Sequence, residues 1–256
     1  RFARMELGRN QWRKYRRQFR EDKFTDGNCQ PILFDLNRVN VEENSGRQPF
    51  NYVIPTGIVR ENNIGGFFQN ALQNEQSLAL RMEGLCAGKT QGIYKLLGID
   101  LRLYDRMKMF VHAEGTKEND FKFKPGQLST FIRIGSDLEN NYYEYEIPMV
   151  ASDPKEITKF SSIDDQYKKL VWLDSNTFDF KMTILKDLKL RRNDKNISLD
   201  TIYTEIDPDR PNAKIKVKGN PNLGQVKGVM IGFRNNDDML KLDAEVWVNE
   251  LRCTGL

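Results

Sequence analysis

The sequence predicts a mainly β protein, a jelly-roll β-sandwich of the galactose-binding-like type. From residue 75 onward, short segments alternate apolar and polar residues with a period of two, the period of a strand that buries one face. Turn-forming clusters of Gly, Pro, Asn and Asp separate these segments. No amphipathic helical pattern stands between them, which favours packed antiparallel sheets over a parallel α/β sheet.

Eight segments carry the strand pattern, and the first illustrates it. Leu78, Leu80 and Met82 fall on one face of that strand. The predicted strands are residues 77–82, 107–113, 130–134, 142–147, 177–184, 213–217, 229–233 and 244–251. Many short strands joined by turns are typical of sandwich and jelly-roll proteins.

The chain before residue 75 has a different texture, and we predict three regions. Residues 1–20 form a basic entry segment, 21–74 an extended arm packed on the sandwich, and 75–256 the sandwich itself. In the entry segment, apolar or small residues recur at spacings of three and four, which predicts a short basic helix, with a strand as the alternative. The arm carries Phe50 and Tyr52, which are too apolar to be left in water.

Charge is divided unevenly along the chain, which holds 40 Lys and Arg against 36 Asp and Glu. Eight basic side chains and one acid lie in the first twenty residues, so that segment carries +7 and the other 236 residues carry −3. Such a segment favours an acidic protein surface or an anionic lipid layer. The acidic body and the lack of a recognition motif argue against nucleic acid. The candidate contact residues are Trp12, Arg13, Lys14, Arg16 and Arg17.

Two motifs suggest catalysis, and neither is complete. Residues 84–90 resemble a phosphate-binding P-loop, but the spacing between the glycines is one residue too short and no helical pattern follows. We predict an ordinary hairpin loop there. His112 is the only imidazole, so it lacks the further ligands of a zinc site, and no nucleophile-elbow motif accompanies it. We predict His112 on the half-exposed face of a sheet.

One predicted strand carries the candidate ligand face. Alternation sends Tyr143 and Tyr145 to the core and places Tyr142, Glu144 and Glu146 on the opposite face. Aromatic rings on such a face stack on sugars, and paired carboxylates serve glycoside hydrolases. A carbohydrate-binding module is therefore the alternative function, and a jelly-roll glycoside hydrolase the second alternative. Carboxylates two apart on one strand also form ordinary solvated faces.

The remaining polar signals are weak. Cys29, Cys86 and Cys253 lack the spacing of a zinc knuckle or a disulfide framework, and the last two sit among apolar residues as core fillers. Acidic turns at Asp207 and Asp237 have no calcium-loop signature. We expect no cofactor and no metal. No apolar run of about 18 residues exists, so no membrane-spanning helix is predicted.

Long motifs in a fixed order resemble the SprA/Sov family. They include VEENSGR, NYVIPTGI, MKMFVHAE, FIRIGSD, NYYEYEIP and EVWVNELR. The matching residues are 41–47, 51–58, 75–78, 92–95, 100–102, 107–114, 131–137, 141–148, 221–224, 228–232 and 245–252. The resemblance covers most of residues 40–150 and 215–256 and is sparse between them.

The resemblance implies that the chain is a segment of a giant outer-membrane translocon. That family belongs to the type IX secretion system, which serves protein export and gliding motility in Bacteroidetes. The parent protein would lie in the outer membrane at the cell surface, with this segment folded outside the bilayer. The implied role is structural, without catalysis. The implied partners are other parts of the translocon chain, its partner subunits and secreted cargo.

Overall fold

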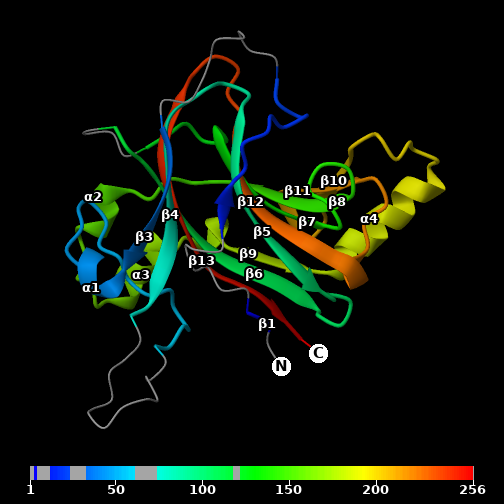
Figure 1. The fold of residues 1–256 in the computed structure, drawn as a ribbon. Helices are drawn as coiled ribbons and strands as arrows, with labels where there is room; N and C mark the ends of the chain where they lie inside the picture. The colour runs from blue at the N-terminus through cyan, green and yellow to red at the C-terminus, as the bar shows by residue number, and fades with distance from the viewer. Residues whose placement is uncertain (1–2, 5–11, 24–32, 61–73, 118–121, 256) are drawn as a thin grey trace.

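Two antiparallel sheets pack face to face in the computed structural model, which describes residues 3–4, 12–23, 33–60, 74–117 and 122–255 (Figure 1). The first sheet has the order β3 (Leu33–Asn40), β4 (Gln76–Leu85), β13 (Leu242–Thr254), β6 (Arg106–Gly115) and β9 (Phe178–Lys181), and β1 (Ala3–Arg4) pairs with β13. The second has the order β10 (Tyr203–Asp207), β11 (Arg210–Lys218), β8 (Tyr142–Pro148), β7 (Leu128–Gly135), β12 (Val226–Asn235), β5 (Thr90–Ile99) and β2 (Arg13–Lys14). The jelly-roll β-sandwich prediction is confirmed.

The core lies between the two sheets and follows the alternation of the strands. Leu78, Leu80 and Met82 of β4 are fully buried in it. Tyr143 and Tyr145 of β8 belong to the same core from the second sheet, as their alternation predicts. The opposite face of each strand is therefore free to carry other chemistry.

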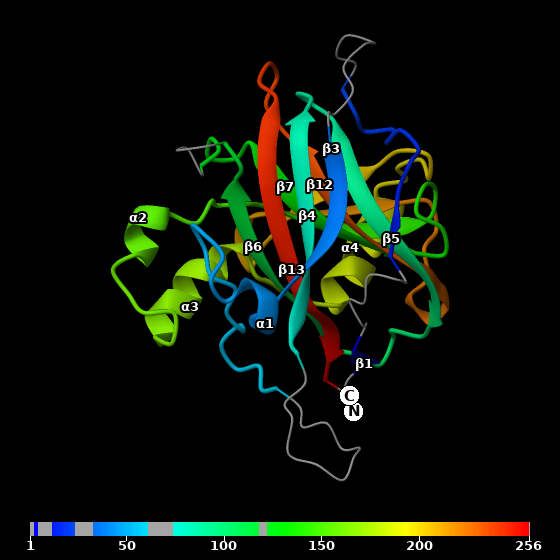
Figure 2. The ribbon, with the colours of Figure 1, turned by 60° about the vertical axis from the view of Figure 1, so that its left-hand side comes forward.

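The outer face of the first sheet is covered by apolar residues from outside the sheet. Helices α1 (Val41–Asn44), α2 (Pro154–Ile157) and α3 (Asp165–Val171) lie on this side (Figure 2). Trp247 of β13 packs there against Tyr52 and Trp172, with ring centroids 5.8 and 6.2 Å away. The indole N–H of Trp172 donates to the carbonyl oxygen of Val53 at 2.7 Å. These contacts bury the apolar residues of the arm.

The entry segment differs from the predicted helix. Residues 12–20 form no helix, and within them β2 pairs with β5 through Arg13–Tyr94 and Lys14–Ile93. The helix prediction is wrong for these residues, because pairing with the edge of β5 supplies their backbone hydrogen bonds. Trp12 enters the core between the sheets, whereas Phe19 packs on the outer face of the second sheet. Part of the predicted helix lies outside the described residues.

A second difference concerns predicted strand 177–184. The strand β9 ends at Lys181, and helix α4 (Thr183–Asp194) begins two residues later. Met182 is buried in the core and Ile184 packs against it, and these apolar residues extended the strand pattern beyond the end of β9. Helix α4 lies beside β10 and β11 at the end of the second sheet (Figure 1). Short 3-10 turns occupy Asp174–Asn176 and Leu223–Gln225.

The loop that resembles a P-loop is a corner between the two sheets. It joins β4 in the first sheet to β5 in the second, so it is not the hairpin that we predicted. Gly84 and Gly88 have φ of 64° and 68°, which the turn requires and which favours glycine. A strand follows, so no helix N-terminus faces the loop.

The first and last described strands lie side by side. Ala3 pairs with Cys253 and Arg4 pairs with Arg252, so these two strands lie together at one end of the sandwich (Figure 1). Among the described residues, no helix is long and apolar enough to cross a membrane.

Candidate functional site

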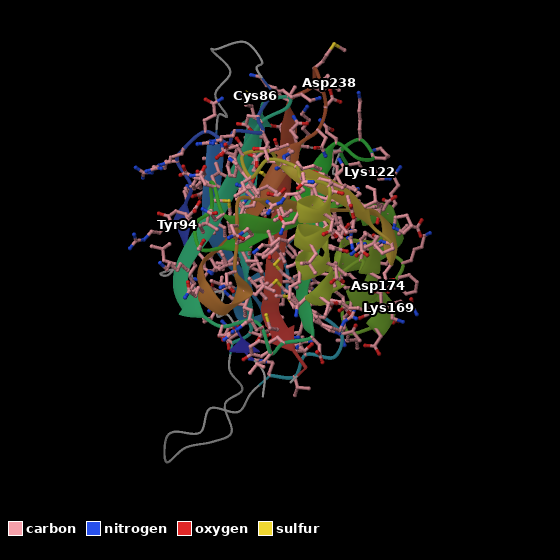
Figure 3. All side chains as sticks on the ribbon, turned by 90° about the vertical axis from the view of Figure 1, so that its right-hand side faces the viewer. Cys86, Tyr94, Lys122, Lys169, Asp174 and Asp238 are labelled. Carbon is pink, nitrogen blue, oxygen red and sulfur yellow. The ribbon has the colours of Figure 1, made fainter. Side chains whose placement is uncertain are left out.

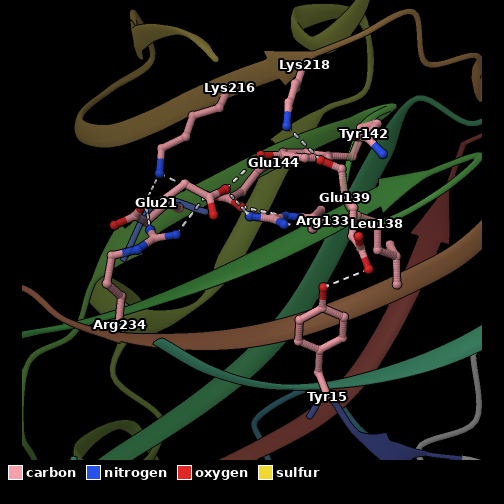
Figure 4. Close-up of polar contacts among 12 residues, drawn as sticks. Tyr15, Glu21, Arg133, Leu138, Glu139, Tyr142, Glu144, Lys216, Lys218 and Arg234 are labelled. Carbon is pink, nitrogen blue, oxygen red and sulfur yellow. Dashed lines mark hydrogen bonds and ion pairs between the residues drawn. The ribbon is translucent and has the colours of Figure 1, made fainter. Parts of the chain in front are cut away.

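The outer face of the second sheet carries a network of buried charges. Antiparallel pairing sets Glu144 of β8 directly opposite Arg133 of β7 and Lys216 of β11. Figure 4 shows these side chains converging above the sheet, with Arg234 of β12 beside them. Because side chains at positions two apart share a face, the alternation of charges along each strand builds the network.

Glu144 is the centre of this network and is fully buried. It accepts from Arg133 Nε at 2.8 Å, from Arg133 Nη2 at 2.6 Å and from Lys216 Nζ at 2.8 Å. Burial alone would raise the pKa of Glu144, but the Lys216, Arg133 and Arg234 cations outweigh it and hold the pKa below the ordinary value. Glu144 is therefore a structural carboxylate.

Glu146 lies two residues along β8 and completes the network. It accepts from Ser129 Oγ at 2.6 Å and contacts both Lys216 and Arg234. Burial raises its pKa, and the Arg234 and Lys216 cations lower it further than burial raises it. Acid catalysis by a carboxyl pair needs one member with a raised pKa. Neither Glu144 nor Glu146 has one.

Residues 12–23 cover this face. Glu21 accepts from Arg133 Nη2 at 2.6 Å and from the Tyr142 hydroxyl at 2.7 Å. Phe19 packs edge-on against Phe131 of β7, with ring centroids 6.1 Å apart. Gly92 of β5 leaves room for it, since a Cβ there would lie 3.3 Å from the Phe19 ring. The chain thus closes its own sheet with one acid and one aromatic ring.

Further along the segment, Glu139 fixes the position of two side chains. The Tyr15 hydroxyl donates to Glu139 at 3.1 Å, and Arg17 Nη1 lies 2.7 Å from the same carboxylate. Burial, followed by the hydrogen bond to Glu139, raises the pKa of Tyr15 to about 12. Tyr15 therefore stays a hydroxyl donor at neutral pH.

The predicted ligand face is brought together but is not open. Tyr142, Glu144 and Glu146 share one face, as predicted, and their exposed fractions are 1%, 0% and 3%. The interpretation as a solvated face is wrong, because cations from β7, β11 and β12 desolvate and pair the carboxylates. The Arg133 guanidinium lies 3.9 Å from the centroid of the Tyr142 ring, so that ring is stacked already.

The cations of this network were not predicted from the sequence. Lys214, Lys216 and Lys218 alternate on β11, and that period of two was the available signal, because it matches the two carboxylates of β8. Glu21 had no such signal, since it lies more than a hundred residues from Arg133 along the chain.

The five candidate contact residues divide into one that is buried and four that are exposed. Trp12 is only 4% exposed, in the core, so it is not presented to a partner as predicted. Arg13, Lys14, Arg16 and Arg17 are exposed at the surface. They line a groove of about 900 Å³ at the rim of the second sheet.

His112 lies on the outer face of the first sheet and is fully buried, so the half-exposed prediction is wrong. The arm and α3 cover it, and the Trp247 ring lies 4.2 Å away. Its Nδ1 lies 2.9 Å from the Val171 carbonyl oxygen and 3.2 Å from Ser152 Oγ, while its Nε2 lies 3.6 Å from Glu114.

This arrangement resembles a Ser-His-Glu triad in composition only. Val171 offers a carbonyl oxygen, so Nδ1 of His112 carries the proton and donates it. It is then unable to accept the Ser152 hydroxyl proton, as a general base must. Ser152 and Glu114 are each 1% exposed, which leaves a substrate no access.

Cysteine and the acidic turns also have structural roles. Cys86 is disulfide-bonded, contrary to our prediction of a simple core filler. Cys253 is a buried free thiol, and Cys29 lies outside the described residues. Asp207 accepts from the Tyr145 hydroxyl at 2.6 Å, and Asp237 from two backbone N–H groups of its own turn. The described part of the chain holds no group of His, Cys, Asp or Glu suited to a metal ion.

Fold and site together define a β-sandwich domain whose two outer faces are covered by its own chain. The family model SprA_N, described as "Motility related/secretion protein", matches residues 1–256. The chain belongs to this family, and the family resemblance found in the sequence is confirmed.

Two solved structures match nearly the whole chain. One is a family 11 carbohydrate-binding module from Clostridium thermocellum in complex with a β-1,3-1,4-mixed-linked tetrasaccharide, at 10% identity and a TM-score of 0.45. The other is the family 11 module of the cellulosomal cellulase Lic26A-Cel5E from the same organism, at 10% identity and a TM-score of 0.43. Each match covers 99% of this chain and 95% of the other. No curated protein matches the chain.

Proposed function

We propose that this chain is a non-catalytic, extramembrane domain of an outer-membrane protein-export translocon of the type IX secretion and gliding-motility kind. Its role is structural: it shapes the assembly and contacts partner subunits or cargo. Membership of a motility and secretion family supports a role in secretion and gliding motility. The resemblance to the SprA/Sov translocons supports a parent protein in the outer membrane.

The covering of both outer faces carries the structural part of this proposal. Aromatic residues of the arm bury the first sheet, and residues 12–23 bury the charges of the second. Glu144, Glu146 and His112 are engaged by other groups of the fold, so the domain offers rigidity and a surface instead of a reaction centre. Contacts with other proteins then fall on the exposed rim.

Two further features fit an extramembrane insertion. The adjacent strands β1 and β13 let a longer chain enter and leave the domain at one edge. The disulfide of Cys86 fits an oxidising compartment outside the cytoplasm, where disulfides persist.

The test is made in cells that depend on the parent protein. Arg13, Lys14, Arg16 and Arg17 are replaced by neutral residues, and we expect weaker assembly of the complex, with less cargo exported and slower gliding. Lys155 and Lys169, which are exposed on α2 and α3, are neutralised as the control. Normal assembly and export by the first variant, at normal protein levels, refutes the contact role.

Carbohydrate binding is the alternative function, and a polar hollow is the observation in its favour. The hollow measures about 450 Å³ and is lined by Ser129, Glu146, Asn212, Asn235 and Asn236 among others. The described lining holds no aromatic ring on which a sugar would stack. Submillimolar binding of a defined sugar in a calorimetric or glycan-array screen would establish this alternative.

A further inference from the structure

The groove at the rim of the second sheet is lined by several segments of the chain. Residues 13–17 and the turn at residues 136–140 line it, and Tyr15 and Arg17 join the two through Glu139. Tyr94 and Leu96 of β5 also line the groove, and the Leu96 side chain is 66% exposed. A volume of about 900 Å³ is that of a site for a small ligand or a few residues of a peptide.

Several cations around this groove make no ion pair with the described residues. In the described part of the chain, Arg13, Arg16 and Lys227 are exposed and make no ion pair. Lys14 lies 3.3 Å from Asp35, and Arg17 lies 2.7 Å from Glu139. The groove therefore has three cations available to a ligand.

The two acids of the groove are engaged by the protein itself. Asp137 accepts three backbone N–H groups of its own turn and the side-chain amide of Asn141. Glu139 accepts from Tyr15 and Arg17. Five cations and two acids line the groove, a net charge of +3. Because both acids are already engaged, the electrostatic potential of the groove is positive, and it attracts an anionic partner.

We propose that this groove binds an acidic polypeptide segment that carries an apolar side chain. The exposed Leu96 and the Tyr94 ring would hold the apolar side chain, while Arg13, Arg16 and Lys227 would pair with Asp or Glu beside it. A groove lined by several segments of the chain suits an extended peptide, whereas a lipid surface is contacted by protruding side chains. The inference rests on the proposed function, because it names the chemistry of the partner that the domain contacts.

The experiment uses the whole 256-residue chain and a short fluorescent peptide rich in Asp and Glu with a central Phe. We expect saturable binding that weakens with added salt, since the pairs are exposed. The variant R16E/K227E is expected to lose at least about fivefold in affinity. These residues lie on different segments, and each single variant, R16E and K227E, tests the groove separately if the double variant does not fold.

The matched control is K155E/K169E, which makes the same change of charge on α2 and α3. Figure 3 places Lys169 and Tyr94 on opposite sides of the molecule. A second control peptide has Gln and Asn in place of the acids. The proposal is overturned if the acidic peptide does not bind, if the neutral peptide binds equally well, or if the control variant loses as much affinity.

Vesicles of phosphatidylcholine with phosphatidylglycerol test whether the groove binds an anionic lipid surface instead of an acidic peptide. Vesicle binding that R16E/K227E abolishes, without peptide binding, assigns the groove to a lipid surface and overturns the proposal. Failure here is distinct from failure of the proposed function. If the acidic peptide binds but the cellular variants export normally, only the contact role in the assembly is refuted. If export is defective but the peptide does not bind, only the acidic polypeptide as the ligand of the groove is refuted.

Discussion

The two outer faces of the sandwich are covered in different ways. The first sheet is covered by an aromatic cluster that includes Phe50, Tyr52, Trp172 and Trp247. The second is covered by a short segment held to a charged network mainly through Glu21. Apolar burial is non-directional and large, whereas a buried ion network stabilises only while each charge keeps its partner. Loss of the first cover should therefore destabilise the whole fold. The second cover, residues 12–23, should be able to open while the rest of the sandwich stays folded.

The largest expected effect follows from truncating the first cover. Trp247→Ala should destabilise the chain by about 4 kcal/mol, because it leaves a cavity beneath the arm. Urea unfolding followed by circular dichroism measures the loss. Leu96→Ala, at an exposed position, is the control and should cost less than about 0.5 kcal/mol. A loss below about 1 kcal/mol for Trp247→Ala would show that the arm does not support the fold.

The next largest effect concerns the network under the second cover. Arg133→Met should cost about 3 kcal/mol, because it leaves Glu144 and Glu21 short of their shared cation in a buried site. The double variant with Glu144→Gln should recover part of this loss, since the unpaired charge is then removed. Equal losses in the single and double variants contradict a coupled network.

Acid should weaken the same network. The pKa values of Glu21 and Glu144 lie below their ordinary value of 4.5, so both carboxylates stabilise the fold above that pH. This stability is lost as the pH falls below about 4.5 toward the folded-state pKa values. Urea midpoints at a series of pH values should drop less steeply in Glu144→Gln than in the wild type. Parallel pH profiles would contradict this assignment.

The smallest effect should be local. Glu21→Gln is expected to cost about 1 kcal/mol, because the segment loses one charged bond to Arg133 while the network keeps its other pairs. Limited trypsin digestion should then cut faster at Arg16 and Arg17, with global unfolding little changed. Glu83→Gln, at a half-exposed carboxylate of β4, is the control. Unchanged cleavage would mean that Glu21 does not anchor the segment.

Local alternation predicts the sandwich well, because a strand with one buried face repeats every two residues. The pattern places Leu78 and Tyr145 in the core correctly. The same rule places Tyr142, Glu144 and Glu146 on one face, but it does not say what covers that face. Burial of those residues depends on cations from three other strands and on Glu21, which are contacts between distant parts of the chain.

The errors have the same origin. Residues 12–20 show a helical spacing, but the edge of β5 offers hydrogen bonds that a single-segment pattern does not include. His112 lies on a strand face that looks half-exposed, and only the packing of the arm and α3 buries it. The distinction between an open ligand face and a closed structural one therefore lies in tertiary contacts.

Hydrogen exchange of the whole chain, read by mass spectrometry, tests most directly the claim that the domain closes its own second sheet. The N–H of Tyr15 donates to the carbonyl oxygen of Gly92 at 2.8 Å, and Lys23 N–H to that of Gly88 at 3.1 Å. We predict slow exchange across residues 12–23 in the wild type and measurably faster exchange there in Glu21→Gln, with β7 and β8 protected in both. Fast exchange of residues 12–23 in the wild type would contradict the account and leave the charged face open to a ligand.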